Sequence, residues 1–321
     1  MIKVLQYGAV FLLLLFVILA FVRAQHALYR QLRRIRLGDH PLWEFMAVDE
    51  TGRHLFVSSR LQLLVIHLDT DEIIATLHFP HAVYGIALVP GLNKGFVCHR
   101  AENIVSVFDL QALQISGQVA TAGAQPEGLL YDAVSNRLFA CNGRGRSLTA
   151  IDPVTETVLG DLPLPGKPAF AVPDGMGNIF VSVDHSDEWI QADAASNAIR
   201  HHWQHVPGEA PGGVAFDLAN GLMFSVYDGR MIVTETGSNL YIAAVAVGNH
   251  PGAVIFDPTT ALLYCANGDG SVTIIKQLRR NEYKLLQRLG TQAGSRSMVL
   301  DSVTKKLYLP GIKYQAGRKP I

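Results

Sequence analysis

A single aromatic residue recurs along most of the chain at intervals that leave few folds open. Seven short segments align on it, and each reads as a strand of mainly apolar residues. The aromatic positions lie 40 to 44 residues apart and are Phe56, Phe96, Phe139, Phe180, Phe224, Tyr264 and Tyr308. Self-similarity at a period of this size indicates a repeat architecture.

Aspartates mark the same two turns in most repeats. In five repeats an aspartate stands seven residues before the aromatic, at Asp49, Asp132, Asp217, Asp257 and Asp301. In the first four repeats another stands thirteen residues after it, at Asp69, Asp109, Asp152 and Asp193. An aspartate carboxylate can accept backbone N–H groups two residues further on, so these positions predict turns.

Each repeat reads as four short strands. An apolar strand ends near the first aspartate, and the aromatic strand follows it. A Gly-containing turn, such as Asn142-Gly143, leads to a third strand that alternates apolar and polar residues, as in 105–109. A more polar fourth strand, such as 156–160, closes the unit. Four strands in about 42 residues is typical of a β-propeller blade. The sequence therefore predicts an all-β fold, a seven-bladed β-propeller with four-stranded antiparallel blades, in one domain over residues 25–321.

The ring is expected to close through the N-terminal part of this domain, because closure removes exposed sheet edges. Residues 28–37 have the position and the alternation of an outer strand, and we expect them to complete the blade that contains Tyr308. Their basic residues, Arg30, Arg33, Arg34 and Arg36, would then lie on a solvated face. This interpretation is preferred to a nucleic-acid or lipid site.

The first 24 residues predict a targeting or anchoring segment. Lys3 is followed by 19 uncharged residues, 4–22, that end at Arg23. This pattern fits a signal peptide cleaved before Gln25, and equally an uncleaved membrane anchor. Both place the domain outside the cytoplasm, in the periplasm or an equivalent space, with membrane contact only through residues 4–22 if they are retained. The arginines that follow argue against simple export, because positive charge favours the cytoplasmic side.

Several segments resemble a known family of repeats. Residues 84–90, 139–144, 233–235 and 266–270 are similar to the YVTN-type repeats of the YncE-like family of exported seven-bladed propellers. The resemblance covers residues 28 to about 315. It implies an extracytoplasmic binding or accessory protein, and a relation to the d1-haem propeller of nitrite reductases. The chain contains no Cys-x-x-Cys-His, so no covalent haem c is expected. Such proteins usually continue into one more strand beyond the point where this chain stops, so we expect either an incomplete sequence or a three-stranded last blade.

Charge and cysteine content exclude some classes of function. Lys plus Arg and Asp plus Glu are both 27, and this balance argues against a general nucleic-acid binder. Three cysteines are too few for a disulfide scaffold, and we expect Cys98, Cys141 and Cys265 to be free, buried thiols.

The candidate site lies on one face of the predicted ring. In a propeller the turns after the fourth and second strands open beside the central channel, and ligand sites favour concave positions. The predicted site residues are His40, Trp43, Glu44, His81, Tyr84, His99, Arg100, Arg144, His185, His250 and Arg296. Trp43 and Tyr84 offer stiff contact area, and Arg100 with Arg144 could hold an anionic group. The alternative is that these are ordinary solvated loop residues.

No motif indicates a catalytic or cofactor site. No H-x-x-x-H or C-x-x-C spacing occurs within one loop, so we predict neither a metal nor another cofactor. Cys98 and His99 are neighbours in a strand and should point to opposite faces, which argues against a thiol–imidazole pair. The leading prediction is a non-catalytic binding propeller for an unknown small molecule or protein. The alternative is a propeller lactonase-type hydrolase that opens a small cyclic ester, which rests on fold analogy.

Overall fold

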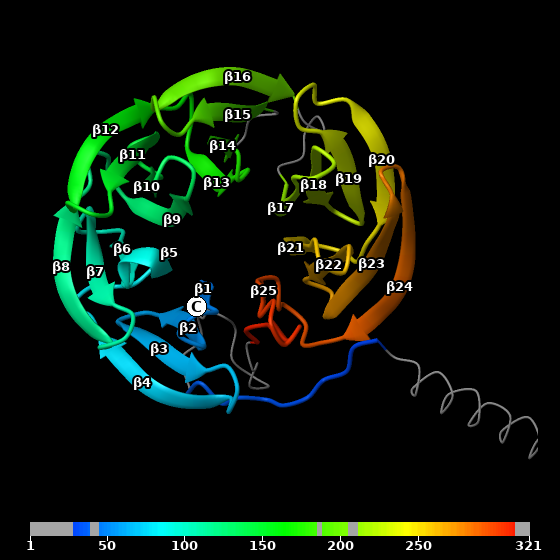
Figure 1. Cartoon of the computed structure of the whole chain (residues 1–321), viewed down its shortest axis with the longest axis horizontal. Helices are drawn as coiled ribbons and strands as arrows, with labels where there is room; N and C mark the ends of the chain where they lie inside the picture. Colours follow the sequence, from blue (N-terminus) through cyan, green and yellow to red (C-terminus); the bar gives the residue numbers. More distant parts are fainter. Residues whose placement is uncertain (1–27, 39–44, 185–187, 205–210, 312–321) are drawn as a thin grey trace, which may run out of the picture.

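The computed structural model describes residues 28–38, 45–184, 188–204 and 211–311. These residues form six four-stranded antiparallel sheets and one two-stranded sheet, which follow one another around a ring (Figure 1). Residues 1–24 and the predicted site residues His40, Trp43, Glu44 and His185 lie outside the described ranges. Among the described residues no helix is both long and apolar enough to span a bilayer.

Each four-stranded sheet is a simple meander whose first strand lies nearest the ring axis and whose fourth lies on the rim (Figure 1). The first three sheets are β1 (Met46–Asp49), β2 (His54–Ser59), β3 (Gln62–His67) and β4 (Glu72–His78); β5 (Ile86–Val89), β6 (Lys94–His99), β7 (Ile104–Asp109) and β8 (Gln114–Ala120); and β9 (Pro126–Asp132), β10 (Arg137–Asn142), β11 (Ser147–Asp152) and β12 (Thr157–Pro163).

The next three sheets repeat this plan, and a shorter sheet completes the ring. They are β13 (Pro168–Pro173), β14 (Asn178–Val183), β15 (Glu188–Asp193) and β16 (Ala198–Gln204); β17 (Gly213–Asp217), β18 (Leu222–Tyr227), β19 (Arg230–Glu235) and β20 (Tyr241–Ala246); β21 (Pro251–Asp257), β22 (Leu262–Asn267), β23 (Ser271–Arg279) and β24 (Glu282–Gly290); and β25 (Val299–Leu300) with β26 (Leu307–Tyr308). One 3-10 turn, η1 (Pro90–Leu92), follows β5.

The recurring aromatic residues pack between neighbouring sheets, as the repeat predicts. Phe56 is fully buried, and its ring centroid lies 5.3 Å from that of Phe108 in the next sheet. Phe180 lies 5.2 Å from Phe216 of the following sheet in the same way. Large rings in the second strand of each sheet therefore form the core between sheets, where buried aromatic pairs are stabilising.

The predicted aspartate turns are confirmed at eight of the nine positions, whereas the carboxylate of Asp69 bonds to Arg53. Asp49 accepts the backbone N–H of Thr51 at 3.0 Å, and Asp257 accepts that of Thr259 at 3.0 Å. After the third strand, Asp109 accepts the N–H of Gln111 at 2.8 Å. These aspartates thus fix the backbone of the turns after the first and third strands, which lie on the ring face opposite the candidate site.

The last sheet differs from the prediction. It has two strands, β25 and β26, instead of four, and residues 28–38 form no strand. The physical reason is visible at Tyr29, whose backbone is bonded by a side chain and not by a neighbouring strand. Tyr29 N–H donates to Gln287 Oε1 at 2.9 Å, and Gln287 Nε2 donates to the Tyr29 carbonyl at 2.7 Å. The segment runs along the rim between β24 and β4 (Figure 1), and its Ile35 and Leu37 pack against the core beside Leu55.

Side-chain ion pairs hold the two-stranded sheet to both of its neighbours. Arg53, which precedes β2, donates two hydrogen bonds to Asp301, at 2.9 and 2.7 Å. Lys306 Nζ donates at 2.9 Å to a carbonyl and at 3.1 Å to a carboxylate of the turn after β3. On the other side, Lys305 pairs with Asp257 of β21 at 2.8 Å. The ring closes at this point through these charged side chains together with apolar contacts, in which Tyr308 packs beside Leu55 and Leu307 packs beside Tyr264.

The Asp257 pair predicts a specific loss of stability in acid. Burial alone would raise the pKa of Asp257, but hydrogen bonds from Lys305 and Thr259 outweigh it and lower the pKa to about 2. An unfolded aspartate titrates near pH ~3.9. The carboxylate therefore stabilises the fold above about pH 4, and this contribution is lost as the pH falls toward about 2. Urea unfolding of wild type and Lys305→Met over this range should show a shallower pH dependence for the variant. Parallel curves would contradict the assignment.

The three cysteines are free and buried, as predicted. Burial raises the pKa of Cys98 and of Cys141, and it raises that of Cys265 to about 12. Each thiol is therefore protonated and unreactive in the folded chain at neutral pH.

Candidate functional site

The candidate site is built from the turns after the fourth and second strands, which we call the channel-end face. Close approach of inner strands shapes one half of this face. A Cβ atom at Gly212 would lie 2.1 Å from the Pro251 carbonyl oxygen, and one at Gly252 would lie 2.5 Å from Arg296 Cβ. Only glycine allows these segments to meet at backbone distance. The same close approach occurs on the other half, where a Cβ atom at Gly85 would lie 2.6 Å from the Leu129 backbone nitrogen, and a chain of ion pairs lies there over the second to fourth sheets.

A chain of ion pairs crosses three sheets on that half. Arg100, in the turn after β6, lies 3.0 Å from Glu127 of β9. Lys167, just before β13, lies 3.1 Å from the other Glu127 oxygen and 4.0 Å from Asp184, which follows β14. Glu127 thus bridges two cations from neighbouring sheets. Because the Glu127 side chain is 24% exposed, while those of Arg100 and Lys167 are 42% and 41% exposed, the cations remain accessible to a ligand.

Arg144 lies in the turn directly beside this network. The turn is held by the Gly143 N–H, which donates to the Gln125 carbonyl at 2.7 Å. A Cβ atom at Gly143 would lie 2.8 Å from the Glu127 carboxylate, so the turn packs on Glu127. The Arg144 side chain is exposed and forms no ion pair within the described part of the chain. Three basic and two acidic residues leave this group with one excess positive charge.

The predicted pair of Arg100 and Arg144 therefore includes a third residue, Glu127, which is not among the predicted site residues. Glu127 pairs with Arg100, and the turn that carries Arg144 packs on it. Nothing in the spacing of Glu127 and Lys167 along the sequence shows that they meet Arg100 in the fold. The Pro-Glu-Gly sequence at the start of β9 is the signal that could have identified Glu127 as a site residue. A charged residue between proline and glycine at the start of an inner strand has no core to enter.

His99 does not reach the surface. Its ring is fully buried, with Nε2 2.8 Å from Ser106 Oγ and Nδ1 3.1 Å from the Ala82 carbonyl oxygen. Burial lowers the pKa of His99, so the imidazole is neutral at pH 7. This predicted site residue fixes the loop before β5. A ligand on the face cannot touch it.

His81 and Tyr84 remain partly accessible beside it. His81 Nδ1 lies 3.0 Å from a Glu102 carboxylate oxygen, and its ring is edge-on to His99 with centroids 5.8 Å apart. Tyr84 packs against the core cluster that contains Phe96. His81 thus pairs with a carboxylate other than Glu127, and Tyr84 belongs mainly to the core.

His250 and Arg296 form a second, separate group over the sixth sheet and the loop before β25. His250 Nδ1 lies 3.5 Å from Asp228, and its backbone N–H donates to the same carboxylate at 2.7 Å. Arg296 donates to the Pro251 carbonyl at 3.3 Å. Both side chains lie against Gly268. The structure thus places the described candidates in two groups on one face, where the sequence predicts a single convergent set.

The described residues hold no group of three or more His, Cys, Asp or Glu side chains placed to bind a metal ion. In β6, Cys98 belongs to the core cluster, while His99 bonds to Ser106. Two shallow grooves lie at the outer rim, one between β20 and β24 and one between β8 and the loop that carries His81.

Comparison with known proteins establishes the fold and no family. No family model matches the chain, and no curated protein matches it. A hydrazine synthase chain from Kuenenia stuttgartiensis superposes with a TM-score of 0.73 at 16% identity, over 88% of this chain and 96% of that one. A chain of the mitotic checkpoint complex gives 0.71 at 10% identity, over 89% and 93% of the two chains. U3-55K gives 0.72 at 11% identity, over 85% and 89%. All three are propeller-type folds, so the chain has an all-β, propeller-type architecture.

Proposed function

We propose that this chain is a non-catalytic binding propeller of the YncE-like type that acts outside the cytoplasm. Its binding surface is the part of the channel-end face around Arg100, Arg144 and Lys167, and it takes an anionic group of a small molecule or protein. The ring then counts as seven-bladed, with the two-stranded sheet and the rim segment 28–38 in the place of the seventh blade. The observation that carries the proposal is the ion-pair chain centred on Glu127.

The Glu127 network prepares cationic side chains for a ligand. Arginine and lysine lose considerable side-chain entropy when they are fixed, and a pre-existing contact reduces that cost on binding. Glu127 orients Arg100 and Lys167 while leaving much of each side chain exposed, and Arg144 is unpaired beside them among the described residues. An incoming carboxylate or phosphate can therefore accept hydrogen bonds from several cations at once.

The hydrolase alternative rests on fold analogy, and the described residues hold no group of three or more metal-binding side chains that would favour it. A site of that kind needs an acid–base pair or a metal next to an open cavity. On the channel-end face Glu102 and Asp228 each pair with a histidine, His81 and His250, and these two pairs belong to separate groups of the face. Glu127 pairs with Arg100 and Lys167, Asp184 lies 4.0 Å from Lys167, and Asp269 accepts a hydrogen bond from Ser271.

The test compares ligands retained by wild type and by variants after native purification, with mass spectrometry of bound small molecules and proteins. Arg100→Ala combined with Arg144→Ala should weaken the retained interaction by roughly 10- to 100-fold, because charge-assisted hydrogen bonds are lost. Thr155→Ala, on the opposite face, should leave it unchanged. Loss with Thr155→Ala and retention by the double variant would place function on the opposite face.

A further inference from the structure

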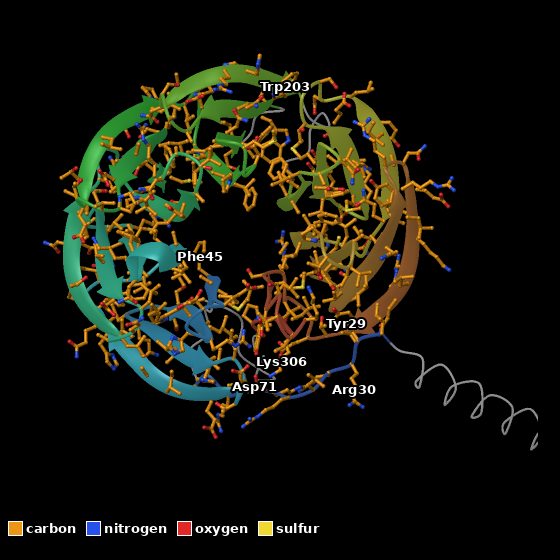
Figure 2. All side chains as sticks on the ribbon, in the orientation of Figure 1. Tyr29, Arg30, Phe45, Asp71, Trp203 and Lys306 are labelled. Atoms are coloured by element: carbon orange, nitrogen blue, oxygen red, sulfur yellow. The ribbon has the colours of Figure 1, made fainter. Side chains whose placement is uncertain are left out.

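The rim segment 28–37 has two different sides. Its odd-numbered apolar side chains face the ring and are partly buried, namely Tyr29, Ile35 and Leu37. Its even-numbered side chains from 28 to 36 are all exposed, namely Leu28, Arg30, Leu32, Arg34 and Arg36. In Figure 2 Tyr29 lies against the ring, where its hydroxyl bonds to that of Tyr264, and Arg30 points away from it. The outward side therefore combines apolar and basic groups.

The neighbouring strand β24 continues this pattern. Lys284, Leu285, Leu286 and Arg288 are all exposed there, the two leucines at 46% and 41%. We call the exposed residues of 28–36 and β24 the cationic flank. It includes one acidic residue, Glu282, which pairs with Arg279 at 3.7 Å. No acidic residue occurs between residues 1 and 38 of the sequence. The flank is thus strongly basic in a chain of zero net charge.

The opposite part of the rim lacks this charge. Strands β8 and β12 contain no lysine or arginine, and β12 carries an exposed acidic residue, Asp161. Exposed apolar side chains are nevertheless present there, such as Ile115 and Leu159. Apolar exposure is therefore common to the rim, and the combination with basic residues distinguishes the flank.

We propose that the cationic flank rests on the surface of an anionic lipid bilayer. The apolar stretch 4–22 is followed by Arg23, which stands only five residues before Leu28. A chain of five residues spans at most about 17 Å, so a retained stretch in the bilayer holds the flank close to the membrane. Arginine and lysine can place their charges among anionic headgroups while neighbouring leucines enter the interface. The inference rests on retention of residues 1–24 and is independent of the channel-end face.

The experiment places a polarity-sensitive dye on the full chain in vesicles. Because the native cysteines are buried, Leu32→Cys and Leu159→Cys can each be labelled specifically. In vesicles of phosphatidylglycerol and phosphatidylcholine, brominated lipid should quench the dye at position 32 and leave the dye at position 159 unaffected. In phosphatidylcholine alone, the quenching at position 32 should be lost or strongly reduced.

A charge variant provides the second measurement. Each basic residue near an anionic surface contributes roughly a factor of five to binding, so Arg30→Gln with Arg34→Gln should raise the ratio of free to bound flank by about 25-fold. Both residues are exposed, so an unchanged melting temperature is expected. Equal quenching at positions 32 and 159 would overturn the proposal. A dye at position 32 whose emission remains that of an aqueous environment would also overturn the proposal. The cationic flank would then be a surface for a protein partner. A mature chain without residues 1–24 contradicts the proposal as well.

Discussion

Replacement of Arg53 by alanine should lower the free energy of unfolding by about 3–5 kcal/mol, because it leaves a buried carboxylate without its cation. The Asp301 side chain is fully buried, and Arg53 contributes two hydrogen bonds to it. The Arg53 guanidinium holds the pKa of Asp301 well below its usual range, so the carboxylate stays charged in the fold at neutral pH. Because the pair joins the first and last sheets, its loss weakens the closure of the ring. Urea unfolding at pH 7 measures the effect.

The matched control is Arg280→Ala. Arg280 also joins two sheets, through Glu235, but these side chains are 47% and 33% exposed. An exposed pair of this kind contributes about 0–1 kcal/mol. Similar losses in the two variants would mean that burial at Asp301 has no special role and that the ring is not closed by this pair.

The double substitution Ile35→Ser with Leu37→Ser should lower the melting temperature by roughly 5–10 °C. These side chains pack on the core beside Leu55 and Tyr308, and exposing them to water costs about 3 kcal/mol in total. Thermal unfolding followed by circular dichroism measures the shift. Leu28→Ser with Leu32→Ser is the control, because both side chains point outward. Equal shifts for the two pairs would show that the segment does not pack on the ring through its odd-numbered residues.

The repeat could be predicted because its signals are local and chemical. The aspartates fix turns by bonding to backbone groups two or three residues away, as Asp109 does with Gln111. The aromatic of the second strand always meets a sheet neighbour, as Phe56 meets Phe108. Because each repeat makes the same local contacts, the recurrence of the sequence pattern predicts the recurrence of the four-stranded sheet.

The closure and the site depend on contacts between distant residues, and local patterns do not determine these. Residues 28–37 alternate like a strand, yet Gln287, 258 residues after Tyr29, bonds to the backbone that a strand would use. By sequence His99 lies at the end of a strand next to the candidate face, but its ring is buried and bonds to Ser106 of the following strand. The partner of Arg100, Glu127, comes from another sheet, so the sequence could place Arg100 on the face without predicting this pair.

Site-specific photo-crosslinking tests the central claim most directly. The probe is benzoylphenylalanine, placed in the full chain either at position 146, an exposed residue of the same turn as Arg144, or at position 155 on the opposite face, and irradiated in cells. Intact-mass analysis should find an adduct at position 146 and none at position 155. Arg100→Ala with Arg144→Ala should abolish the adduct at position 146, since two cations of the binding surface are removed. An adduct at position 155 alone, or one at position 146 that survives both substitutions, would contradict a binding surface built on this network.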